Sequence, residues 1–131
     1  MIATRPSGPH RPILIVDDDL DHRHTCRELL EEHGYTVQEA GDGKKALARL
    51  VDPAEAQPCL VLLDLSMPLM DGWQLLAIMK SYLRLHSIPV VLISAQEPLL
   101  DPLEHGTIAA YLPKPHNADE LLALAAKFCA C

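Results

Sequence analysis

Polar side chains of three chemical kinds follow the apolar runs of this sequence. Carboxylates stand after the first and third runs (Asp17, Asp18 and Asp64), a hydroxyl follows the fourth (Ser94), and an amine lies just beyond the fifth (Lys114). Carboxylates that share a crevice repel each other and raise one another's proton affinity unless a cation is present. Lys114 supplies at most one positive charge, so a hard divalent cation, Mg²⁺, is the expected partner. A metal beside a carboxylate, a hydroxyl and an amine favours phosphoryl chemistry, in which a carboxylate attacks the transferred group.

The repulsion between these carboxylates has a measurable consequence. We expect Mg²⁺ to raise the thermal stability of the protein, because it neutralises the crevice. Without metal, removing one carboxylate by Asp17→Ala or Asp18→Ala is expected to raise the stability as well.

Short apolar runs alternate with stretches of helical period, and this alternation predicts the elements that position the polar side chains. Strands are expected at residues 13–16, 36–39, 60–63, 90–93 and 110–112, and helices at 21–33, 44–51, 72–83, 99–105 and 117–128. The first, third and fourth runs are continuously apolar, as in parallel strands buried on both faces. The pattern predicts an α/β, flavodoxin-like doubly wound (βα)5 fold, with a parallel sheet in order 2-1-3-4-5 and helices on both faces. In that order, ligands bind between the carboxyl ends of strands one and three.

Composition excludes several classes of protein. The 131 residues carry a formal net charge of -7 and have no strongly basic run, which argues against direct nucleic-acid binding. Apolar runs are far shorter than the roughly 18 residues of a membrane span, and no signal-peptide pattern opens the chain. With 49% hydrophobic and 22% charged residues, the sequence is typical of a soluble globular domain.

The domain boundaries follow from the same pattern. Residues 1–11 hold proline, serine and glycine without apolar period and are expected to form a flexible tail, residues 12–128 the domain, and residues 129–131 a short C-terminal tail. Cysteines at positions 26, 59, 129 and 131 match no zinc-binding spacing, and we interpret them as reduced thiols. His22 and Cys26, four residues apart on the first helix, could share a metal, but without a third ligand they are interpreted as ordinary surface and core residues.

Four strings carry a resemblance to a known family. I-L-I-V-D-D-D, L-V-L-L-D-L-S-M-P-L-M-D-G-W, V-V-L-I-S-A and Y-L-P-K-P occur in this order. In order and approximate spacing they resemble the receiver domain of two-component response regulators, over about residues 12–128. The resemblance points to the single-domain type of response regulator.

The resemblance implies a metal site at the carboxylates. Asp64 would be the phospho-acceptor. Asp18 and Asp64 would bind Mg²⁺ directly, together with the backbone carbonyl of Ser66, and Asp17 would act through a metal-bound water.

The resemblance also implies the residues that hold the phosphoryl group. Ser94 and Lys114 would bind phosphoryl oxygens, and Tyr111 would change rotamer on activation. His116 stands where phenylalanine commonly follows K-P in the family, which bears on how Tyr111 packs. Pro98 and Pro102 fall in the expected fourth helix, which should therefore be short, late or irregular.

The implied function is a phosphorylation-dependent switch rather than an enzyme. A sensor histidine kinase or a histidine phosphotransfer protein would donate the phosphoryl group to Asp64, and the switch would act through protein contacts in the cytoplasm. The downstream target is not identified by the sequence, and a homodimer is left open.

Two other functions compete with this interpretation. A haloacid-dehalogenase-like phosphohydrolase would use Asp17 as nucleophile and Asp19 as acid, but the chain is short for that class and Asp64 would have no role. A receiver-like scaffold that is never phosphorylated is the other alternative. The intact set of polar residues disfavours it.

Overall fold

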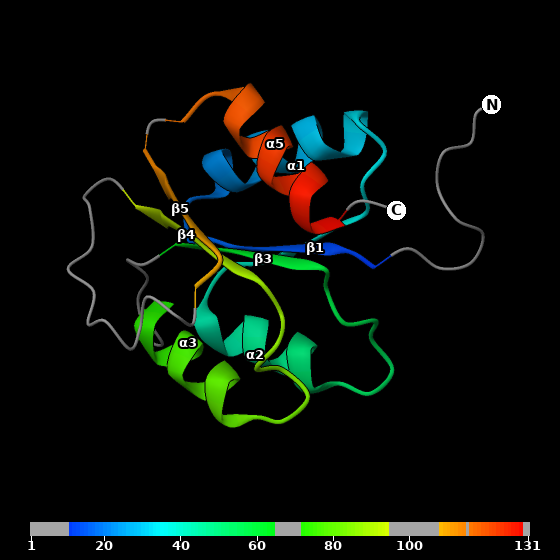
Figure 1. Cartoon of the computed structure of the whole chain (residues 1–131), viewed down its shortest axis with the longest axis vertical. Coiled ribbons are helices and arrows are strands. Elements are labelled where there is room, and N and C mark those ends of the chain that lie inside the picture. The colour runs from blue at the N-terminus through cyan, green and yellow to red at the C-terminus, as the bar shows by residue number, and fades with distance from the viewer. Residues whose placement is uncertain (1–10, 65–71, 95–107, 115, 130–131) are drawn as a thin grey trace.

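The computed structural model describes residues 11–64, 72–94, 108–114 and 116–129. Strands and helices alternate along most of the chain (Figure 1). The elements are β1 (Ile13–Val16), α1 (Leu20–Glu32), β2 (Val37–Ala40), α2 (Gly43–Val51), β3 (Leu60–Asp64), α3 (Gly72–Ser81), β4 (Val90–Ser94), β5 (Ala110–Pro113) and α5 (Ala118–Cys129).

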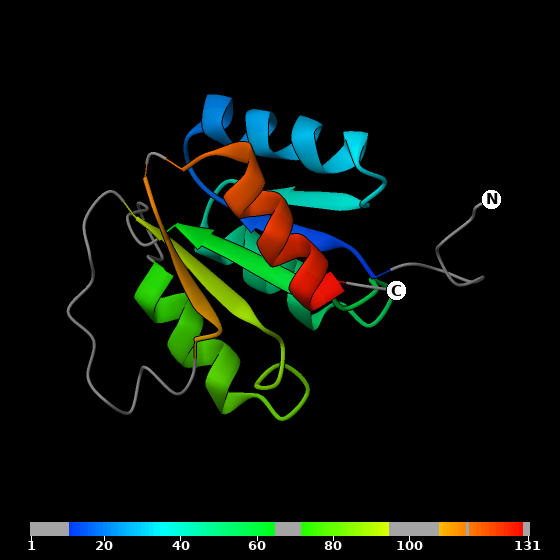
Figure 2. The same ribbon diagram turned by 45° about the horizontal axis from the view of Figure 1, so that its top comes forward.

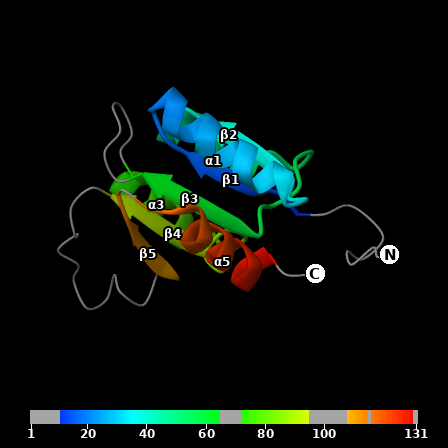
Figure 3. The same cartoon turned by 90° about the horizontal axis from the view of Figure 1, so that it is seen from above.

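The five strands form one parallel sheet in the order β2-β1-β3-β4-β5. Viewed from above, the labelled strands follow this order across the sheet (Figure 3). The predicted doubly wound fold is therefore confirmed. The register pairs Val16 with Leu63, so the residue after β1 and the last residue of β3 reach the same edge of the sheet.

Helices cover both faces of this sheet. Helices α1 and α5 lie side by side on one face, and α2 and α3 lie on the other (Figures 1 and 2). Successive side chains of a strand point to opposite faces, so Leu14 packs with α2 and α3, whereas Ile15 packs with α1 and α5. Burying an aliphatic side chain of this kind contributes roughly 1.5 to 3 kcal/mol. The apolar central strands thus fix both helical layers.

Local signals set the ends of α1. Asp19 caps its N-terminus: its side chain accepts hydrogen bonds from the backbone N–H groups of Asp21 and His22. At the other end, Gly34 has a φ of 90°, a backbone conformation that residues with a side chain rarely adopt. Asp19 therefore starts the helix, and Gly34 follows its end.

Asn117 and Glu120 cap the N-terminus of α5. The Asn117 side chain accepts a hydrogen bond from the Glu120 backbone N–H at 2.8 Å, and Glu120 Oε1 accepts one from the Asn117 N–H at 3.3 Å. This reciprocal pair satisfies two backbone N–H groups at the start of the helix. The expected fourth helix, with Pro98 and Pro102, lies outside the described residues.

The interpretation of all four cysteines as reduced thiols is wrong for two of them. Cys59 and Cys129 form a disulfide, with 5.4 Å between their Cα atoms. Cys129 is the last residue of α5 and is buried. Helix α5 packs on the face of the sheet to which the side chains of Cys59 and Leu60 also belong. This packing brings Cys129 to Cys59, although the two are 70 residues apart in the sequence.

None of the four described helices has the length and apolar character needed to cross a bilayer.

Candidate functional site

Three carboxylates meet at the edge of the sheet, and we call them the acidic cluster: Asp17, Asp18 and Asp64. One carboxylate oxygen of each lies within 4.8 Å of the others. Asp17 follows β1 and Asp64 ends β3, and these strands are neighbours in the sheet. Asp17 is 2% exposed and Asp64 is 6% exposed, whereas Asp18 faces solvent. Two buried carboxylates and one open to solvent could hold a hard divalent cation.

Lys114 belongs to the same site. It follows β5, and its Nζ donates a hydrogen bond to Asp64 Oδ2 at 3.2 Å. Burial opposes the charged form, but the hydrogen bond to Asp64 and the charge of Asp17 outweigh burial, so the pKa of Lys114 lies above its ordinary value. The lysine therefore presents a permanent positive charge beside Asp64.

Asp17 is held by hydrogen bonds to both of its carboxylate oxygens. Its Oδ1 accepts a bond from the Asp19 backbone N–H at 2.9 Å, and its Oδ2 pairs with His22 Nδ1. Burial alone would raise the pKa of Asp17, but these hydrogen bonds and the charge of Lys114 lower it below the ordinary value. Crowding by carboxylates alone would raise the proton affinity of Asp17, and the cations beside it reverse the net direction.

The cation that the sequence interpretation missed is His22, which it treated as an ordinary residue. Its hydrogen bond to Asp17, followed by that to Cys26, raises the pKa of His22 to about 10. The ring thus supplies a second positive charge beside the acidic cluster. A sequence signal existed, because His22 lies in the first turn of the helix that begins just after Asp17 and Asp18.

The remaining predicted residues are placed only in part. Ser94 ends β4 and pairs in the sheet with Pro113, so its backbone lies at the same edge as Asp64, but its side chain is outside the description. Ser66 is likewise outside the described residues. Tyr111 lies in β5, half-buried against the core on the side of α2 and α3.

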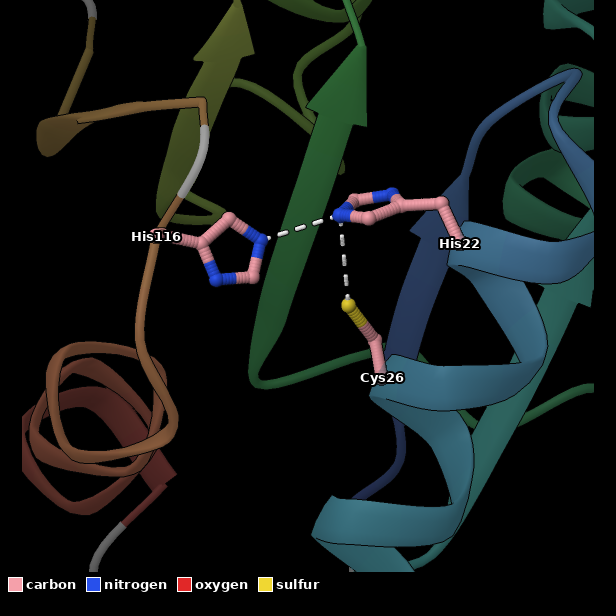
Figure 4. A group of neighbouring side chains, drawn as sticks. All are labelled: His22, Cys26 and His116. Atoms are coloured by element: carbon pink, nitrogen blue, oxygen red, sulfur yellow. Dashed lines mark hydrogen bonds between the residues drawn. The ribbon is translucent and has the colours of Figure 1, made fainter.

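A second group of potential ligands lies beside the acidic cluster. His22 and Cys26 on α1 meet His116, which precedes α5 (Figure 4). His116 is a third potential ligand that the sequence did not reveal, because it stands 94 residues after His22. Its approach depends on the packing of α5 beside α1.

Comparison with known proteins decides the family. The model of the response regulator receiver domain matches residues 13–126. The chain belongs to this family. It is 33% identical over 112 residues to the protein PilG of Pseudomonas aeruginosa, covering 84% of this chain and 81% of PilG. It is 39% identical over 113 residues to the transcriptional regulatory protein CpxR of Escherichia coli, covering 85% of this chain but only 46% of CpxR.

Solved receiver structures share the fold of this domain. The response regulator TrrA of Thermotoga maritima, crystallised with Mg²⁺ and BeF, has a TM-score of 0.77 and 27% identity, covering 90% of this chain and 98% of TrrA. The Mn²⁺-bound response regulator Rcp1 has a TM-score of 0.78 and 25% identity, covering 92% of this chain and 95% of Rcp1. CheY4 of Vibrio cholerae has a TM-score of 0.76 and 23% identity, covering 92% of this chain and 99% of CheY4. At this identity the likeness shows the fold alone.

Membership of the family has two consequences. Receiver domains are phosphorylation-dependent signalling switches rather than catalytic enzymes, so the phosphohydrolase alternative is not supported. Histidine kinases phosphorylate receiver domains, and divalent metals are bound in solved members of the family. The chain spans about half the length of CpxR, so the activity of that whole regulator is not transferred to it.

Proposed function

We propose that this receiver domain accepts a phosphoryl group on Asp64. The observation that carries the proposal is the pairing of Asp64 with Lys114 at 3.2 Å inside a cluster of three carboxylates. An oxygen of Asp64 would attack the phosphorus of a phosphohistidine in a sensor histidine kinase or a histidine phosphotransfer protein. The new P–O bond forms as the P–N bond breaks, and the histidine nitrogen leaves with the electron pair.

Mg²⁺ is the proposed metal of the acidic cluster. The oxygen donors suit a hard cation, with Asp18 and Asp64 as direct ligands together with the carbonyl of Ser66. Both oxygens of Asp17 already accept hydrogen bonds, which supports a role for Asp17 through a metal-bound water. When bound, the metal neutralises negative charge on the transferred group.

The other residues of the site would bind the phosphoryl group and respond to it. Lys114 provides a charged donor already directed at Asp64, and Ser94 is proposed as a hydroxyl donor from the end of β4. Charge-assisted bonds of this kind contribute roughly 1.5 to 3 kcal/mol each. Tyr111 lies in β5, the strand that ends one residue before Lys114. A movement of Lys114 toward the phosphoryl group would therefore be transmitted along the backbone to Tyr111. We propose that the resulting change in Tyr111 alters contacts with a downstream protein in the cytoplasm.

Incubation with acetyl phosphate tests this function. Wild-type protein with Mg²⁺ should gain one phosphoryl group, located on Asp64 by peptide mass spectrometry after borohydride reduction. Asp64→Asn should gain none, and omission of Mg²⁺ should abolish or strongly slow the labelling of wild type. Asp119→Asn, on an exposed position of α5, is the matched control and should label like wild type.

Two results would contradict the proposal. Labelling of Asp17 in place of Asp64 would point to a different nucleophile. Absence of labelling with acetyl phosphate, and also with a phosphorylated histidine phosphotransfer domain, would favour the alternative of a receiver-like scaffold that is not phosphorylated.

A further inference from the structure

We propose that His22, Cys26 and His116 form a binding site for Zn²⁺, distinct from the acidic cluster, and we call these three residues the His-Cys cluster. Each offers a ligand atom, and the three atoms lie within 4.8 Å of one another. Figure 4 shows the His22 and Cys26 side chains extending from adjacent turns of α1 toward the ring of His116. Two imidazoles and a thiolate are donors that Zn²⁺ prefers and Mg²⁺ does not.

The distances fit a tetrahedral ion. Zinc bonds of about 2.0 to 2.1 Å to nitrogen and 2.3 Å to sulfur place two ligand nitrogens about 3.3 Å apart and a nitrogen and a sulfur about 3.6 Å apart. The Nε2 atoms of His22 and His116 are 2.9 Å apart, and Cys26 Sγ is 3.7 Å from His22 Nε2. Opening the two rings by a few tenths of an ångström would accommodate the ion, and its fourth position is left for water.

His22 is already oriented as a metal ligand. Its Nδ1 pairs with the Asp17 carboxylate, which directs Nε2 toward Cys26 and His116. A carboxylate that accepts the second ring N–H is the usual support of a zinc-bound histidine, because it fixes the tautomer and makes the ligand nitrogen more basic. Asp17 thus supports the ligand from the acidic cluster without being a ligand itself.

The facing nitrogens need an electropositive partner between them. Two lone pairs at 2.9 Å would repel, so either a proton or a cation must lie between the Nε2 atoms of His22 and His116. Zinc would replace that proton and bind the Cys26 thiolate, so that binding releases the thiol proton and any ring proton to solvent. Cys26 is 2% exposed, and its burial shields the zinc–sulfur bond from oxidants and competing ligands.

Spectroscopic titration with Co²⁺, followed by displacement with Zn²⁺, tests the site. The protein should carry Cys131→Ser with the Cys59–Cys129 disulfide intact, so that Cys26 is the one free thiol. Excess Mg²⁺ should be present to occupy the carboxylates. We expect one equivalent of Co²⁺ to produce visible bands of tetrahedral intensity with a thiolate-to-cobalt charge-transfer band, and one equivalent of Zn²⁺ to remove them.

Variants separate this site from incidental binding. Cys26→Ser should abolish the charge-transfer band, and His116→Gln should weaken Zn²⁺ binding by at least about tenfold. His24→Ala, a histidine on the exposed side of the same helix, is the matched control and should bind like the parent. His116→Gln decides the question alone if the buried Cys26 variant does not fold.

Three results would overturn the proposal. They are an absence of one-to-one binding, octahedral cobalt bands without thiolate character, and equal affinity in the His116→Gln and His24→Ala proteins. The phosphorylation of Asp64 is measured separately, so failure of one proposal leaves the other standing.

Discussion

At the scale of single residues, the balance of charge around Asp17 differs from what a list of carboxylates suggests. Three acidic groups share a small space, yet His22 and Lys114 bring two cations to them. Asp17 is also bonded to the Asp19 backbone N–H. The buried carboxylate is therefore stabilised in the metal-free protein, whereas the exposed Asp18 has none of these described contacts.

Asp17→Asn should therefore lower the stability of the metal-free protein, contrary to the expectation from repulsion alone. The variant loses charge-assisted hydrogen bonding to His22 and leaves that cation unbalanced, a cost of roughly 1.5 to 3 kcal/mol. Urea denaturation without Mg²⁺ measures the effect. Asp18→Asn, the matched variant, should leave the stability unchanged or slightly higher, because Asp18 adds repulsion in an exposed position. Equal shifts in the two proteins would contradict the role assigned to His22.

At the scale of elements, α1 is tied to the edge strand β2 by ion pairs on Glu39. Arg23 Nε donates to Glu39 Oε1 at 2.7 Å, and Arg27 Nη1 donates to Oε2 at 2.5 Å. Burial would raise the pKa of Glu39, but the bonds from Arg27 and Arg23 outweigh it and lower the pKa below the ordinary 4.5. Arg23 also donates to the Asp17 carbonyl at 2.6 Å, so the same arginine reaches the backbone of the acidic cluster.

Glu39→Gln should reduce stability at neutral pH by about 1 kcal/mol, a modest value because solvent screens Arg27. The sign with pH follows from the lowered pKa: the ionised pair stabilises the fold above the unfolded-state pKa of 4.5, and this contribution is lost as the pH falls below that value. Wild type and variant should therefore converge in stability under acid conditions. Urea midpoints from neutral to acid pH check this.

The Glu31→Gln variant is the control for that experiment. Glu31 forms an exposed ion pair with Arg27, so its substitution should change the midpoint little at any pH. A Glu39→Gln deficit that persists unchanged at low pH would show that packing, not charge, connects α1 to β2.

At the scale of the whole molecule, the Cys59–Cys129 disulfide closes most of the domain. It joins the residue before β3 to the last residue of α5, 70 positions later, across the layer that contains α1 and α5. By its effect on the chain entropy of the unfolded state, a disulfide that closes a loop of this length stabilises the fold by at most about 4 kcal/mol. In a reducing compartment the two cysteines stay as thiols and the disulfide does not form. The stability of this domain should therefore depend on redox conditions.

Reduction with excess dithiothreitol should accordingly lower the free energy of unfolding by about 2 to 4 kcal/mol. Denaturation with and without reductant measures the difference. The Cys59→Ser and Cys129→Ser double variant should resemble the reduced protein and respond no further to reductant. If oxidised and reduced wild type unfold at the same denaturant concentration, the disulfide does not stabilise this domain.

The sequence by itself determined the parallel sheet and its polar edge. Short continuous apolar runs that alternate with helical stretches indicate strands buried on both faces. The residues that end two of them, Asp17 and Asp64, come together because β1 and β3 are neighbours. The resemblance to receiver domains added roles for residues such as Ser66 and Ser94, whose side chains the structure does not describe.

Only the tertiary structure decided which helix surfaces meet. His116 reaches His22, and Cys129 reaches Cys59, because α5 packs beside α1 on one face of the sheet. The two residues of the first contact are 94 residues apart in the sequence, and those of the second are 70 apart. Local sequence spacing cannot predict contacts over such separations. Hydrophobic periodicity specifies that a helix must be covered, but the side chains placed at the contact follow from how the layers dock.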